Sequence, residues 1–68
     1  MHHPLIVREI NRRARLGKPV VAIYVLDGRE RQGRIIRARR RHGILEVLCL
    51  GIHRWAIVKN DWAVWEVL

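Results

Sequence analysis

Arginine side chains crowd the middle of the sequence, where Arg37, Arg39, Arg40 and Arg41 fall within five consecutive positions. A guanidinium group binds a phosphate through two parallel hydrogen bonds and also stacks on flat rings. Like charges this close repel one another unless anions or acidic groups from elsewhere balance them. The whole chain holds only six acidic residues, so we expect this run to contact the phosphate groups of a ligand.

The charge of the whole chain agrees with that chemistry. Fourteen lysines and arginines, twelve of them arginine, stand against six acids, which gives a net charge of +8 and a sequence pI near 11.5. A field this positive attracts polyanions over long distances, and the preference for arginine favours nucleic acid. An arginine-rich or thermophilic surface would give a similar composition. The basic residues are not confined to one face of an amphipathic helix, which argues against an anionic membrane.

The residue types that most enzymes and metal sites use are scarce. The chain has no serine or threonine, and its one cysteine, Cys49, lies in an apolar run. His2 and His3 lie beside the first residue, in a segment too short and polar for a targeting sequence. His42 and His53 have no ligand pair nearby. Because catalysis needs an activated nucleophile or acid–base pair and a metal needs several ligands, we expect no enzyme activity, metal, cofactor or small-molecule substrate.

These basic residues must be positioned by a short helix and a set of strands. The helix is expected at about 4–16, because Pro4 suits a first helical turn and Ile6, Ile10 and Ala14 share one stripe. Gly17 and the proline two positions later end it. Val, Ile, Leu and Trp dominate the remainder, which turn residues divide into expected strands at about 20–26, 30–40, 44–50, 52–58 and 62–67. Connections this short favour an antiparallel meander that bends into a partly open barrel over residues 19–68.

The second expected strand is charged and carries Gly33 in its middle. A glycine inside a strand commonly marks a sharp bend, which would let this long strand wrap from one side of the barrel to the other. Ile35 would then turn inward. The charged side chains that would lie outside are Arg29, Glu30, Arg31 and Arg34.

The same stretch resembles a known family. The pattern Val21-x-Ile23-Tyr24-x-x-Asp27-Gly28-x-x-x-Gln32-Gly33-x-Ile35 resembles the first Sm motif in its bacterial Hfq form, and a basic helix precedes that motif in Hfq as well. Near the C-terminus, IVKNDWAVWEV is similar to the second Sm motif. The resemblance covers about residues 5 to 67. It implies a mainly β fold, in which a short N-terminal helix precedes a five-stranded, strongly bent, antiparallel SH3-like (Sm) barrel.

The resemblance also implies three groups of RNA-binding residues. A purine-binding face would use Tyr24, Gly28, Arg29 and Gln32. A pore or loop would bind phosphates through Arg39, Arg40, Arg41, Lys59 and Asn60. A rim on the helix would use Arg12, Arg13 and Arg15. Two departures bear on the pore. Asn60 follows Lys59 where Hfq has a histidine, and the loop aromatic residue of Hfq is missing. The resemblance therefore favours purine-rich over uridine-rich single strands.

Assembly is expected because one domain of 68 residues has a marginal core. A lone cysteine allows no disulfide within the chain and fits a reducing cytoplasm. By resemblance, we expect a closed homo-oligomeric ring of about five to seven subunits. In such a ring the strand near 52–58 would pair with a neighbour's strand near 62–67, and the three tryptophans of these segments would pack there: Trp55, Trp62 and Trp65.

These expectations lead to one main hypothesis and two alternatives. The first is a cytoplasmic RNA chaperone, an Sm-like ring that binds single-stranded RNA by charge and stacking and touches no membrane. The second is a structural or assembly subunit that keeps the Sm fold and binds nucleic acid non-specifically or not at all. A third is a monomeric duplex-DNA binder on an SH3-like barrel.

Overall fold

One helix and five strands make up the chain, and the computed structural model describes residues 4–68. Met1, His2 and His3, which sequence analysis set aside as a targeting segment and as metal ligands, lie outside the described residues. The helix α1 spans Val7–Arg15. The strands are β1 (Val20–Leu26), β2 (Arg29–Arg41), β3 (Ile44–Cys49), β4 (Ala56–Val58) and β5 (Val64–Glu66).

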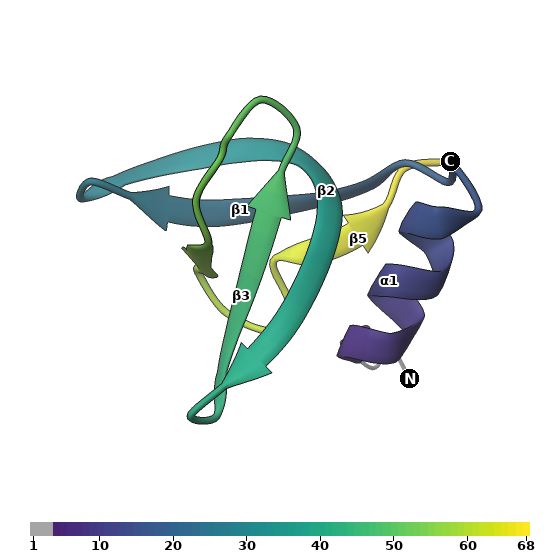
Figure 1. Cartoon of the computed structure of the whole chain (residues 1–68), viewed down its shortest axis with the longest axis horizontal. Helices are drawn as coiled ribbons and strands as arrows, with labels where there is room; N and C mark the ends of the chain where they lie inside the picture. The colour runs from purple at the N-terminus through teal and green to yellow at the C-terminus, as the bar shows by residue number, and fades with distance from the viewer. Residues whose placement is uncertain (1–3) are drawn as a thin grey trace.

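The strands form a small closed barrel with α1 beside it (Figure 1). The order is β2-β3-β4-β1-β5, and β1 also pairs with β2, so that β2, β3, β4 and β1 close on themselves and β5 extends the sheet from β1. All pairings are antiparallel. The prediction of a mainly β fold, with a short helix followed by an antiparallel barrel, is confirmed at this level.

Two tight hairpins connect β1 to β2 and β2 to β3. Both have positive φ at two successive residues, Asp27 and Gly28 in the first and His42 and Gly43 in the second. Two-residue loops of this kind match the natural twist of paired strands, and glycine adopts positive φ without steric cost. These turns confirm the expected divisions between the strands at 20–26, 30–40 and 44–50.

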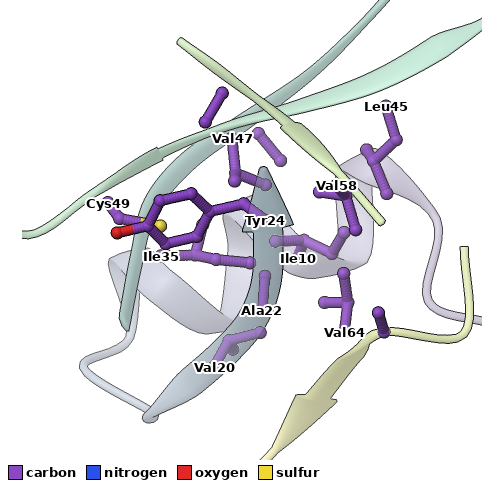
Figure 2. Packing of buried hydrophobic residues seen from close by; sticks show 13 residues of the cluster. Ile10, Val20, Ala22, Tyr24, Ile35, Leu45, Val47, Cys49, Val58 and Val64 are labelled. Atoms are coloured by element: carbon purple, nitrogen blue, oxygen red, sulfur yellow. The ribbon is translucent and has the colours of Figure 1, made fainter. Parts of the chain in front are cut away.

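The core is filled by alternate residues of the strands together with Ile10 of α1 (Figure 2). On β1 the buried residues are Val20, Ala22 and Tyr24. The Tyr24 ring lies beside Cys49 and Ile35 (Figure 2). A Cβ atom added at Gly33 would lie 3.2 Å from Cε1 of Tyr24, so the glycine leaves room for this ring.

β2 contains a bulge that contributes to its bend. The pairing of β2 with β3 shifts between Ile35 and Arg37, which leaves Ile36 as an extra residue. A bulge of this kind bends the strand and increases its twist, and β2 curves strongly in Figure 1. The bulge at Ile36 was not predicted from the sequence, and the expected bend at Gly33 itself stays a prediction. The expected inward turn of Ile35 is confirmed, because it is 2% exposed.

The last two strands are shorter than predicted. β4 holds only Ala56–Val58 of the expected 52–58, because the chain turns after Cys49, where the Ile52 amide donates to the Cys49 carbonyl. β5 holds only Val64–Glu66 of the expected 62–67, because Asn60 and Ala63 form a turn before it. The helix is also shorter than 4–16, beginning at Val7.

Candidate nucleic-acid interface

Within residues 4–68, a minority of the basic side chains form ion pairs with acidic side chains and the majority do not. Each of the six carboxylate side chains lies within 4 Å of a basic side chain, and five cations account for all of these contacts: Arg13, Arg39, Arg40, Arg54 and Lys59. The other nine of the fourteen cations have no carboxylate partner among residues 4–68. These nine are Arg8, Arg12, Arg15, Lys18, Arg29, Arg31, Arg34, Arg37 and Arg41.

Three of the unpaired arginines lie on one side of α1. Arg8, Arg12 and Arg15 are four and three positions apart, so they share one stripe of the helix, and all three are exposed. The opposite flank holds Arg13, whose guanidinium lies 3.3 Å from Glu66 of β5. Of the predicted rim residues, Arg12 and Arg15 are therefore free to bind a ligand, whereas Arg13 is half-buried and engaged in an ion pair.

The helix is fixed against β2 by the side chain of Asn11. Its amide nitrogen donates to the Ala38 carbonyl at 2.9 Å, and its amide oxygen accepts from the Ala38 backbone N–H at 2.7 Å. The side-chain amide thus pairs with the edge of β2 as a neighbouring strand would. Sequence analysis missed this residue, since a lone asparagine in a helix gives no sign of a distant partner.

A groove opens between α1 and β2 beside this contact. It has a volume of about 280 Å³ and is lined by Asn11, Arg15, Ile36 and Arg37. The bulge places Ile36 on the surface, where the side chain is 50% exposed. The groove is therefore lined by one exposed apolar side chain, one amide and two unpaired guanidinium groups. We call Arg8, Arg12, Arg15 and Arg37 the cationic surface.

The predicted phosphate-binding run at the end of β2 is only partly available. Nε of Arg39 donates to Glu46 at 2.8 Å, and the guanidinium lies 4.1 Å from the centre of the Trp55 ring. Arg40 bonds to the Gly43 carbonyl and lies 3.4 Å from Asp61. Arg41 is exposed and has no carboxylate partner within the described chain. Arg41 therefore extends the cationic surface more readily than its two neighbours.

The other predicted pore residues lie in the segment between β4 and β5. Lys59 is paired with Glu30 at 3.2 Å. The side chain of Asn60 accepts a hydrogen bond from the Trp62 backbone N–H, which is an Asx turn rather than a ligand contact. Trp62 is 62% exposed within one chain. Its expected packing at a contact between subunits stays a prediction.

The predicted purine face is not formed within one chain. Tyr24 is 4% exposed and belongs to the core, so its ring is closed to a base. Gln32 pairs with Ile23, and Tyr24 pairs with Arg31. Successive residues of a strand point to opposite sides, so Gln32 and Tyr24 lie on opposite sides of the sheet. Gly28 is occupied with the hairpin turn and Arg29 is exposed beside it.

Cys49 takes no part in the cationic surface. Its side chain is buried beside Tyr24, and this desolvation raises the pKa of the thiol from 9.0 to about 11. The thiol is therefore protonated at neutral pH, the unreactive form for nucleophilic chemistry.

Within residues 4–68, no three His, Cys, Asp or Glu side chains are close enough together to hold a metal ion. The nine-residue α1 is the one helix of this range, and no helix there has the length and apolar character to cross a membrane. The chain matches no protein-family model, no curated protein and no solved structure.

Proposed function

We propose that the protein binds single-stranded RNA through its cationic surface, chiefly by contacts to phosphates, as an Sm-like RNA chaperone of the cytoplasm. The observation that carries this proposal is the surplus of unpaired cations. Within residues 4–68 every carboxylate side chain is already paired, yet nine basic side chains have no acidic partner there. A polyanion is the ligand that would neutralise them.

Two exposed apolar side chains favour a single strand over a duplex. Ile36 lines the groove together with Arg15 and Arg37, and Trp62 is exposed beside Asp61, which contacts Arg40. Unstacked bases pack on such side chains, whereas the bases of a duplex are stacked on one another. With Tyr24 in the core, base choice on this surface would come from shape and stacking rather than from a purine pocket.

The ring that the resemblance implies remains a prediction. The pairing expected to hold it would need a free edge on β4, and β4 already pairs with β3 on one side and β1 on the other. β5 pairs with β1 on one side only among the described strands. A ring would therefore need the β1–β4 pairing to open or would need another contact.

Salt-dependent binding tests the proposal. We expect the Arg12→Gln/Arg15→Gln/Arg37→Gln variant to bind a labelled single-stranded RNA more weakly than wild type. Its slope of log affinity against log salt should fall by roughly two, because each phosphate contact on a single strand contributes about 0.7. Trp62→Ala should lower affinity without changing that slope. Fluorescence anisotropy over a salt series measures both.

A matched control removes the same charge elsewhere. The variant Arg29→Gln/Arg31→Gln/Arg54→Gln also loses three positive charges, but from the β1–β2 hairpin and the β3–β4 loop. It should keep most of the wild-type slope. Equal losses in the two triple variants would mean that charge acts diffusely and no surface is preferred. Absence of RNA binding by the wild type would favour the structural subunit, and preference for a DNA duplex would favour the third hypothesis.

A further inference from the structure

α1 lies beside β2 (Figure 1), and two links join this part of the chain to the strand. The side-chain amide of Asn11 forms two hydrogen bonds with the backbone of Ala38, at 2.9 and 2.7 Å. After the end of the helix, the Gly17 carbonyl accepts a hydrogen bond from the guanidinium of Arg34 at 3.2 Å. The links occur in opposite order along the helix and the strand, so the residues between them on one element face those between them on the other.

The groove lies between these two links and is short. Apart from Asn11, its lining residues are Arg15 on α1 and Ile36 and Arg37 on β2, and all three fall between the linked positions. Its volume of about 280 Å³ is below the range of about 300–1,000 Å³ that is usual for drug-sized ligands. The groove therefore has room for about one nucleotide. A strand that ran along it would meet a link at either end.

The residues that line the groove carry two positive charges and no negative one. Arg15 and Arg37 are exposed and have no carboxylate partner in residues 4–68. A phosphate monoester at the end of a strand carries a charge of about −1.5 to −2 at pH 7 and has three acceptor oxygens. A phosphate inside a strand carries a single charge. Because each guanidinium can bind two phosphate oxygens, two guanidinium groups match a terminal phosphate better than an internal one.

We infer that this groove binds the terminal phosphate monoester of an RNA strand, with Arg15 and Arg37 on the phosphate oxygens. The inference rests on the proposed binding of single-stranded RNA and adds a preference for one kind of strand end. Ile36 is 50% exposed, which allows an apolar contact with the sugar or base of the end nucleotide. The rest of the strand then contacts the exposed guanidinium groups of Arg8 and Arg12, which share a stripe of α1 with Arg15.

Strands that differ only at their ends test the inference in competition against one labelled RNA, followed by fluorescence anisotropy. Four strands of one sequence carry a 5′ phosphate, a 3′ phosphate, a 5′ phosphate and a 3′ phosphate both blocked as methyl esters, or hydroxyl groups at both ends. One of the two monoester strands should bind the wild type about tenfold more tightly than the hydroxyl strand, because a hydrogen bond between charged groups is worth at least that factor. Each methyl ester leaves its phosphate a single charge, so the blocked strand should lose most of this gain.

Two double variants with the same loss of charge locate the preference. Arg15→Gln/Arg37→Gln removes both cations of the groove and should bind the monoester and hydroxyl strands with equal affinity. Arg8→Gln/Arg12→Gln removes two cations of the cationic surface that do not line the groove. It should bind every strand more weakly and keep the preference for the monoester. Circular dichroism checks that each variant is folded.

The outcomes separate this inference from the proposed function. Equal binding of all four strands by the wild type would overturn the inference and leave RNA binding in place. A preference that Arg15→Gln/Arg37→Gln retains would do the same. Failure of the wild type to bind any strand would overturn the proposed function and this inference with it. If the groove variant is not folded, Ile36→Glu decides, since its carboxylate should abolish the preference, whereas Ile44→Glu, at a 46% exposed position on β3, should keep it.

Discussion

Gly33 and Tyr24 occupy neighbouring positions on β2 and β1, where one residue supplies the space that the other fills. The ring of Tyr24 comes so close that a Cβ atom at Gly33 would lie 3.2 Å from Cε1 and 3.5 Å from the hydroxyl oxygen. This glycine also belongs to the Gln32-Gly33 pair of the first Sm motif. In this chain its observed role is steric, and it serves the core rather than a ligand.

Substituting Gly33 should therefore destabilise the fold. We expect Gly33→Ala to lower the free energy of unfolding by about 1–3 kcal/mol, the usual cost of overpacking a core, in urea denaturation. Gln32→Ala, at the exposed neighbouring position, is the control and should change it little. Tyr24→Ala should cost about 3–5 kcal/mol as a cavity, so any loss of RNA binding in that variant would report unfolding. Equal stability of Gly33→Ala and wild type would show that the ring moves freely.

The limits of sequence analysis are also visible at single residues. Val21, Ile23 and Val25 alternate with Ala22, Tyr24 and Leu26, and both sets are apolar. Alternation therefore identifies the strand but not the side that faces the core. The orientation of Tyr24 depends on the space at Gly33 and on strands far along the chain. That is why the motif predicts a purine face at Tyr24, whereas within one chain the Tyr24 ring lies in the core.

At the scale of elements, α1 is joined to the barrel by a polar contact as well as by Ile10. The Asn11 amide satisfies the N–H and C=O of Ala38 on an edge of β2 that no other strand of residues 4–68 covers. Unpaired strand edges favour association with other chains. The helix thus closes this edge and, in the same position, presents Arg12 and Arg15 beside β2.

Removing this contact should loosen the helix and the strand edge together. We expect Asn11→Ala to lower the free energy of unfolding by about 1–3 kcal/mol, because two partly buried backbone groups lose their partners. Hydrogen exchange of the Ala38 amide should accelerate. Arg12→Ala, one position along and without a carboxylate partner in the described chain, should change neither quantity. An unchanged exchange rate at Ala38 would mean that another group protects this edge.

The turns and the bulge show what local sequence can predict about elements. Asp27-Gly28 and His42-Gly43 fix both hairpins, since their turn chemistry is local. The helix and the first three strands were accordingly placed within a few residues. The bulge at Ile36 carries no glycine and depends on how β2 meets β3. The three-residue β4 and β5 exist only through their pairing with β1 and β3, which no local pattern specifies.

At the scale of the whole molecule, the unpaired cations place a repulsive field on a small domain. In the part of the chain that the structure describes, nine cations have no carboxylate partner. Exposed ion pairs such as Arg54 with Asp27 offset little of this repulsion, because solvent screens them. A multivalent anion that binds the folded state should therefore stabilise it by mass action.

Thermal unfolding tests this expectation. Tripolyphosphate should raise Tm by several degrees relative to sodium chloride of the same ionic strength, since about 1 kcal/mol shifts Tm by about 4–8 °C in a domain of this size. The Arg12→Gln/Arg15→Gln/Arg37→Gln variant should lose most of this shift and the Arg29→Gln/Arg31→Gln/Arg54→Gln variant should keep it. Equal shifts with both salts would indicate simple screening of charge.

β1 pairs with other strands along both of its edges, and this has a consequence for how the chain folds during synthesis. Leu26 pairs with Arg29 across a tight turn, whereas Val20 pairs with Glu66, 46 positions later. The two hairpins can form as soon as β3 leaves the ribosome. The other edge of β1 stays unpaired until β4 and β5 have been made. At about 5–20 residues per second, the 40 or so residues between β1 and β5 take roughly 2–8 s to make. For those seconds one edge of β1 has unpaired backbone N–H and C=O groups, and such edges favour pairing with other chains.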